Sequence, residues 1–266
     1  MYGRRSVCLF VLSALLAAPA VPQIATTPVQ RDPQAVAVLN QVVTAAGGSA
    51  VLGAVQDVTA SGTITFNWAG VDVPGNATVK GRGITQFRLD ATVSDGNQTW
   101  AISNGQAFEK GPDGTVTPGR YRTPSSFANV PFPLAHLLSA IGDSSMSLSY
   151  VGLETRNSSQ VHHIQVKSST SAPGNGRGIP TSRLDTTDFF IDSTTAQIVA
   201  VLSVAFSNDF PGQTCPRELR FSDYRTVNGL VAPFSIIELV DGQRTFAIQL
   251  NQVSFNTGLS DKDFEP

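Results

Sequence analysis

The sequence predicts an α+β fold in which one strongly curved antiparallel β-sheet forms a half-open barrel with short helices on its concave side. Apolar and polar residues alternate with a period of two in several separate segments, which is typical of strands with one buried face. Residues that favour turns, mainly Gly and Asn, separate these segments. Only two segments carry a helical apolar stripe, and both are short, so the sheet must curl around them to bury its apolar face.

The N-terminus predicts a secretory signal peptide. Arg4 and Arg5 precede an apolar run over residues 7–18, and Ala18-Pro19-Ala20 is a small-x-small cleavage site. The run is shorter than the roughly 20 residues that span a bilayer, which argues against the alternative of a retained anchor helix. We expect cleavage after Ala20, with Ala25 as a second candidate, and export to the periplasm without stable membrane insertion.

The rest of the chain is predicted to hold one domain. After the signal peptide, residues 1–20, residues 21–31 show no period and are expected to form a flexible tether. Residues 32–266 contain no linker-like break and are expected to form a single domain. Cys8 lies in the signal peptide, so Cys215 would be the only cysteine of the processed chain and no internal disulfide is expected.

Two helices are expected. Asp32 is placed to cap the first free amides of a helix, Pro33 to start it, and Gly47-Gly48 to end it. The apolar stripe of this helix is expected to comprise Val36, Leu39, Val43 and Ala46. The second helix is expected after Pro131-Phe132-Pro133, and its stripe comprises Leu134, Leu137, Leu138 and Ile141.

The strands are predicted from one-sided alternation that begins at Val58. The residues expected on the buried faces are Val58, Ala60, Ile64, Phe66 and Trp68; Phe87, Leu89, Ala91 and Val93; Trp100 and Ile102; Ile198, Ala200, Leu202, Val204 and Phe206; and Phe246, Ile248 and Leu250. Turns are expected at Asp95-Gly96-Asn97 and Asp241-Gly242. About ten antiparallel strands would then place one face on a core or a ligand and the other on water.

Composition and motifs exclude several functional classes. The chain carries 18 Lys and Arg against 20 Asp and Glu, and its basic residues are scattered singly, so no nucleic-acid partner is expected. No catalytic motif or phosphate-binding loop appears, so we expect no enzyme activity, no catalytic residues and no cofactor. His162 and His163 are adjacent in a predicted strand and would point to opposite faces, so no metal site is expected. Cys215 has no nearby His or Asp in the sequence that would make it a nucleophile.

The remaining candidate site is the apolar face itself. Its expected ligand-binding residues are Phe66, Trp68, Phe87, Leu89, Trp100, Ile102 and Phe108 from the strands, with Leu134, Leu137, Leu138 and Ile141 from a helix that would act as a lid. The alternative is that these side chains fill a dry core, which is the usual position of apolar stripes. A cavity among them would suit a lipid or another apolar ligand.

Three stretches of the sequence resemble the periplasmic lipoprotein-carrier (LolA-like) superfamily, which includes outer-membrane lipoprotein-sorting proteins. They are residues 187–195, which begin Thr-Asp-Phe-Phe-Ile-Asp, residues 221–234, which contain Asp223-Tyr224-Arg225, and the closing segment from Asn256 to Phe264. The resemblance covers residues 32–266 and implies a curved sheet of about eleven strands whose concave side, plugged by helices, binds acyl chains of lipoproteins or other lipids. Residues 111–126 and 168–182 are longer than a minimal carrier needs.

The sequence therefore predicts a soluble exported protein that binds a lipid or a lipoprotein acyl chain in an apolar half-barrel cavity. The first alternative is an envelope interaction or sensor domain of the same fold, with a filled interior and an envelope protein as its partner. A second is an outer-membrane barrel, which the capped helix at Asp32 and the polar ending at residues 263–266 argue against. A third is a hydrolase, which would show a carboxylate pair clustered at a pocket.

Overall fold

The computed structural model describes residues 29–103, 106–118, 130–156, 158–168, 186–206 and 214–266. The predicted signal peptide and most of the predicted tether lie outside these residues, as do large parts of residues 111–126 and 168–182. No helix within the described ranges combines the length and the apolar character needed to span a bilayer.

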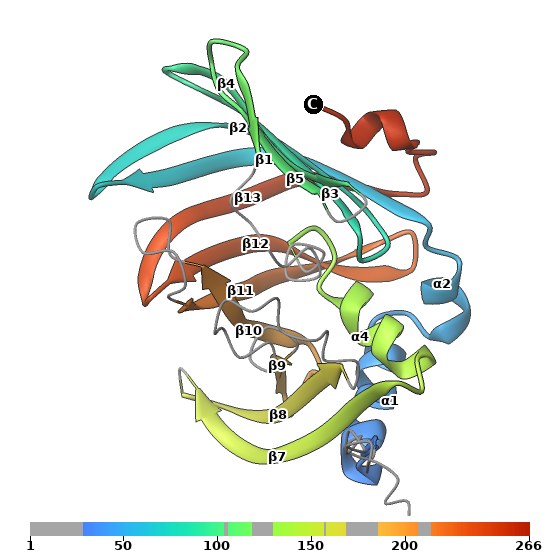
Figure 1. The fold of residues 1–266 in the computed structure, drawn as a ribbon. Coiled ribbons are helices and arrows are strands. Elements are labelled where there is room, and N and C mark those ends of the chain that lie inside the picture. The colour runs from blue at the N-terminus through green and yellow to red at the C-terminus, as the bar shows by residue number, and fades with distance from the viewer. Residues whose placement is uncertain (1–28, 104–105, 119–129, 157, 169–185, 207–213) are drawn as a thin grey trace, which may run out of the picture.

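A single antiparallel sheet, strongly twisted and curved, organises the described residues (Figure 1). Its strands are β1 (Asp57–Trp68), β2 (Val71–Arg82), β3 (Gln86–Val93), β4 (Gly96–Ser103), β5 (Gln106–Lys110), β6 (Val116–Pro118), β7 (Met146–Arg156), β8 (Ser159–Ser168), β9 (Thr186–Asp192), β10 (Ile198–Phe206), β11 (Thr214–Val227), β12 (Leu230–Val240) and β13 (Gln243–Phe255). Their order is β6-β5-β4-β3-β2-β1-β13-β12-β11-β10-β9-β8-β7, so β6 and β7 are the edges. The predicted curved, open α+β sheet is confirmed.

The sheet has 13 strands, more than the eleven or so expected. The excess lies partly in β6, which the sequence did not indicate, and in β5, where it indicated only Phe108 as a strand residue. Neither strand has a buried face, since β6 is exposed along its length and no residue of β5 is fully buried. Alternation of apolar residues reports a buried face and not a strand as such, so these strands leave no period-two signal.

The helices are α1 (Pro33–Ala45), α2 (Ser49–Gly53) and α4 (Leu134–Gly142), which gather at one side of the sheet, and the 3₁₀ segment η2 (Asp261–Phe264) near the C-terminus (Figure 1). The expected start of α1 is confirmed, because the Asp32 carboxylate accepts a 2.8 Å hydrogen bond from the Gln34 amide. The expected end is confirmed as well. Gly47 has φ 122°, and a Cβ there would lie 2.3 Å from the Gly229 carbonyl oxygen.

The core-facing side of α1 differs from the expected stripe. The buried residues are Ala35, Val38, Leu39, Val42 and Ala46, whereas Val36 and Val43 are only partly buried. The helix is therefore rotated, because α1 packs both on the sheet and beside α2, and a simple i, i+3, i+7 count assumes a single partner. This rotation leaves Val43 free to line a groove described below.

Four register shifts interrupt the described strand pairs, and two of them bear on the apolar faces. The pairing of β1 with β13 shifts register at Ser61/Gly62. Ile64 of β1 and Val253 of β13 lie on opposite sides of this shift, and both remain in the core. A second shift between Ile198 and Ala200 makes the expected single face of β10 wrong, because Val201 joins the main core while Ala200 and Leu202 face the other side. One extra residue reverses every side chain beyond it.

The turn expected at Asp95-Gly96-Asn97 lies one residue earlier, since Ser94 and Asp95 connect Val93 to its partner Gly96 and Asn97 belongs to β4. The turn expected at Asp241-Gly242 is present, and a similar turn that was not expected lies at Asn228-Gly229. Asp241 and Gly242 have φ of 51° and 75°, and Asn228 and Gly229 have φ of 50° and 84°. Positive φ at both central residues is the type I′ geometry that suits the twist of antiparallel strands. Each pair thus joins two long neighbouring strands directly.

The face of the sheet remote from the helices is partly covered by the C-terminal segment. Phe264 of η2 is fully buried, and Lys80 pairs with Asp263 at 2.9 Å. The segment that leads to η2 is fixed by Asp57, whose carboxylate accepts hydrogen bonds from the amides of residues 257, 258 and 259 and from the Thr257 hydroxyl at 2.7–3.1 Å. Asp57 is only 4% exposed, so these bonds form away from bulk water.

We expect Asp57→Ala to lower the free energy of unfolding by about 3 kcal/mol, because three amides lose their acceptor near the protein interior. The measurement is urea unfolding followed by circular dichroism, with Asp95→Ala in the exposed β3–β4 turn as the control. A loss no larger than that of the control would show that the Asp57 carboxylate does not fix the C-terminal segment.

A second ionic cluster ties β7, β8 and β9 together. His163 Nδ1 lies 2.7 Å from Glu154 and Nε2 lies 2.9 Å from Asp188, and its ring packs on Phe190 at 4.5 Å. Arg156 also belongs to this cluster, because its guanidinium carbon lies over the Phe190 ring, 3.7 Å from the ring centre. Two carboxylate acceptors require a proton on each ring nitrogen, so the arrangement favours the imidazolium.

Burial opposes this charge, but the hydrogen bonds from Asp188 and Glu154 outweigh it and raise the pKa of His163 above its ordinary 6.5. We expect the stabilisation by His163 to be complete below about pH 6.5 and to be lost as the pH rises through the raised value. His163→Gln should abolish this pH dependence of the unfolding free energy and cost roughly 2 kcal/mol at acidic pH. His162→Gln is the matched control, and an unchanged pH profile in His163→Gln would contradict the assignment.

Candidate functional site

An apolar groove opens between the helices and the sheet where β1 begins and β2 ends. It has a volume of about 460 Å³. The helices α1, α2 and α4 and the chain just before α4 supply its walls, and β1 and β2 supply its floor. Its lining residues are Asn40, Val43, Ser49, Leu52, Gly53, Val55, Gln56, Asp57, Val58, Gly81, Gly83, Pro131, Phe132, Ala135, Leu138 and Ile141.

The predicted lid helix contributes to this groove with only part of its stripe. Leu138 and Ile141 line it and are partly buried. Leu137 is 1% exposed and packs in the core, and Leu134 lines a smaller pocket together with Tyr224. Helix α4 therefore presents one apolar side to the core and a second to the groove.

The predicted aromatic residues meet on the core side of the sheet. Phe66 stacks on Trp68 at 5.4 Å and lies 5.3 Å from Trp100, and Phe246 completes this aromatic cluster at 6.4 Å from Phe66. The cluster is built across β4, β1 and β13. None of its members lines the groove.

The other predicted strand residues are divided between the two faces. Phe87, Leu89 and Ile102 are at most 4% exposed and belong to the main core. Phe108 pairs with Ala101, the neighbour of Ile102, and so lies on the opposite face from the others. The sequence analysis assumed that Phe108 continues the same face, but in β5 the residue on the core side is Ala107.

A buried ion pair lies beside the aromatic cluster. Arg217 Nε is 2.5 Å from Glu238, whose other oxygen accepts a hydrogen bond from Thr245. Glu238 is the cross-strand partner of Phe246, which places the pair next to the aromatic cluster. Arg217 is 2% exposed, so each charge depends on its partner for compensation.

Asp57 is the one acidic residue among the described residues that line the groove, and its carboxylate faces the C-terminal segment. Burial alone would raise the pKa of Asp57, but the hydrogen bonds from Thr257, Leu259 and Gly258 keep it below its ordinary value. His136, on the core side of α4, is neutral, because burial lowers its pKa to about 4, and its ring packs on Phe189 at 5.7 Å.

Sequence reasoning missed most of the groove. Leu52 and Val55 belong to α2 and the turn after it, and α2 has only five residues, too few for a helical period. Pro131 and Phe132 were expected only to precede the second helix, yet they line the groove. The doubled Gly47-Gly48 ahead of α2 was the one available signal, since it marks a sharp change of direction.

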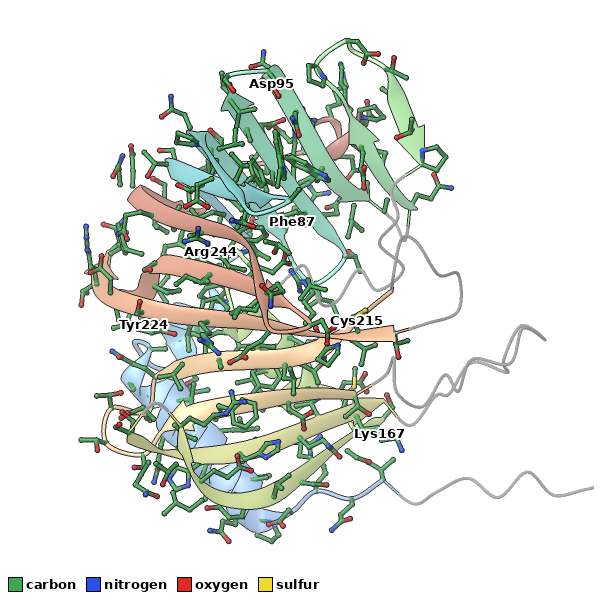
Figure 2. All side chains as sticks on the ribbon, turned by 90° about the vertical axis from the view of Figure 1, so that its left-hand side faces the viewer. Phe87, Asp95, Lys167, Cys215, Tyr224 and Arg244 are labelled. Atoms are coloured by element: carbon green, nitrogen blue, oxygen red, sulfur yellow. The ribbon has the colours of Figure 1, made fainter. Side chains whose placement is uncertain are left out.

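Cys215 lies in a separate pocket of about 320 Å³ at the start of β11, at the opposite end of that strand from Tyr224 (Figure 2). Asp188 also lines this pocket, but its carboxylate is bound by His163 and by Gln165 at 3.0 Å. Among the described residues, no group of three or more His, Cys, Asp or Glu is arranged to hold a metal ion.

Comparison with known proteins relates the fold, but not the sequence, to other families. No family model and no curated protein matches the chain. A domain from Vibrio parahaemolyticus described as outer-membrane lipoprotein-sorting is 11% identical, with a TM-score of 0.51 over 86% of this chain and 95% of that one. A LolA superfamily protein from Nitrosomonas europaea is 10% identical, with a TM-score of 0.51 over 87% and 97%. A DUF1329 family protein from Desulfovibrio piger is 11% identical, with a TM-score of 0.52 over 87% and 97%.

These structures match nearly from end to end, and their similarity concerns the fold, since the identities are low. The resemblance to the LolA-like superfamily noted in the sequence is therefore confirmed at the level of the fold, which this chain shares with these structures over 86–87% of its length.

Proposed function

We propose that this protein is an exported, non-enzymatic, lipid-binding protein of the periplasm that holds a lipid or lipoprotein acyl chain in the apolar groove between α1, α2, α4 and the sheet. The observation that carries the proposal is the groove itself. It is lined largely by aliphatic and aromatic side chains, and its size falls in the range of small-molecule sites. The protein would act as a carrier if it released the bound acyl chain to an acceptor.

Two further observations support the proposal. Leu138 and Ile141 are only partly buried although both are large and apolar, so a ligand that covered them would be stabilised by the water released. The fold is shared with a lipoprotein-sorting domain and with a LolA superfamily protein. Both observations suit an acyl chain, which needs apolar contact and few polar partners.

The alternative function is an envelope interaction or sensor domain that binds a protein. The edge strand β7 favours it, because Val151 and Leu153 are 53% and 55% exposed there. Residues 30–32 already run parallel to the start of β7, with the amides of Leu148 and Asp32 bonded across at 2.8 and 2.9 Å. An open edge with apolar side chains suits the addition of an extended segment from a partner.

We expect the processed protein, purified from the periplasm of its host, to carry an acyl lipid that native mass spectrometry with lipid extraction detects. Ala135→Trp should fill the groove and weaken acyl-chain binding at least about tenfold, because the added ring competes for the same space. Val71→Trp adds the same ring at a position that is 63% exposed and outside the groove, and should bind as the unmodified protein does.

Equal acyl-chain affinity of Ala135→Trp and Val71→Trp would show that the ligand does not bind in the groove. A protein that appears at its bare mass and takes up no added lipid would end the lipid-binding proposal. Capture of an extended peptide along β7 that Leu153→Lys abolishes would then support the alternative.

Intrinsic tryptophan fluorescence distinguishes lipid binding in the groove from lipid binding at the aromatic residues on the core side. The chain has two tryptophans, and both belong to the aromatic cluster of Phe66, Trp68, Trp100 and Phe246. We expect lipid bound in the groove to leave their emission unchanged, since neither lines it. A blue shift on lipid addition that persists in Ala135→Trp, after correction for the added ring, would place the acyl chain against the aromatic cluster instead.

A further inference from the structure

We infer that the groove accepts an acyl chain whose polar end is uncharged, as in an ester- or amide-linked chain, and discriminates against an ionised fatty acid. This inference rests on the proposed function and adds the chemical class of the ligand. Two features of the groove carry it: the positive charges that its described lining lacks, and the neutral polar groups at its rim.

The described lining of the groove offers no cation to an anionic ligand. None of the described residues that line it is Lys, Arg or His. Arg31, which lies beside the end of α4, donates to the carbonyl oxygens of Ala140, Ile141 and Asp143 at 3.0–3.2 Å and does not line the groove. A carboxylate or phosphate drawn into this apolar space would therefore lose water without gaining an ion partner, which is costly.

The carboxylate of Asp57 does not supply a charge to the groove. Asp57 is the cross-strand partner of Arg82, and both side chains bind the C-terminal segment on the face of the sheet remote from the helices. The amides of residues 257–259 occupy both carboxylate oxygens there, so the carboxylate is not available to a ligand in the groove.

The rim of the groove carries neutral hydrogen-bonding groups. Asn40, Ser49 and Gln56 line it and are exposed. Amide and hydroxyl side chains both donate and accept, so they suit ester carbonyls, amides and free hydroxyls. An acyl chain in the groove would thus bring its linkage, and not a charged end, to these three residues.

The test compares two ligands with the same acyl chain, palmitate and monopalmitoylglycerol, by titration calorimetry on the processed protein at about pH 8, where palmitate is ionised. We expect monopalmitoylglycerol to bind at least about tenfold more tightly. Asn40→Lys places a cation at the rim and should tighten palmitate binding up to about fivefold while leaving monopalmitoylglycerol unchanged. Gln41→Lys makes the same charge change on the next residue of α1, outside the groove, and should alter neither affinity.

The outcomes separate this inference from the proposed function. Palmitate binding as tightly as monopalmitoylglycerol would overturn the inference and leave lipid binding in place. An equal response of Asn40→Lys and Gln41→Lys would also overturn it, because the effect would then come from net charge and not from the rim. Failure of both ligands to bind would overturn the proposed function and the inference together.

Discussion

The structure depends on one constraint: a single sheet must bury an apolar face across most of its strands although its edge strands, β6 and β7, do not pair with each other. Within the described ranges, three short helices of 13, 5 and 9 residues lie on that side. They cannot cover the face of a flat sheet of this width, so curvature has to bring the sheet's own side chains together. The contacts of Phe66 with Trp100 and Phe246 show this, because they join three strands without any helix.

The bulges make this curvature compatible with the core. At Gly62 the backbone of β13 comes so close that a Cβ would lie 2.1 Å from the Gln249 carbonyl oxygen. The shift there, and the one before Ala200, allow each strand to bend while both of its halves keep apolar residues inside. The bulge between Ile198 and Ala200 places Ala200 on the outer face of the sheet, where it packs with Phe190 near the His163 cluster.

The fold class and many of its elements follow from the sequence, because burial leaves a periodic signal. The N-cap at Asp32, the stop at Gly47 and the faces of β1, β3 and β13 all report a local interaction or a single buried side. The failures share a cause as well. The phase of β10, the face of Phe108 and the rotation of α1 depend on pairing with strands or helices far away in the sequence, and a local period does not contain that information.

The candidate site is the part of the structure that the sequence predicts least well, for the same reason. The apolar stripe of α4 was found correctly as a group, but the division between Leu137, which packs in the core, and Leu138, which lines the groove, is set by where α1 and α2 lie. Similarly, Asp57 reads as an ordinary strand residue until the amides 200 residues later in the chain close around it. Long-range packing, and not composition, turns these residues into a site.

The shared fold does not decide what this protein binds, since sequences of 10–11% identity adopt it. The side chains of α4 are more informative. Leu137 and Ala140 of this helix are buried in the core, where they serve folding. Leu138 and Ile141 pack against the core only in part, and both line the groove. Core packing therefore explains least the two side chains to which the lipid-binding proposal assigns a role.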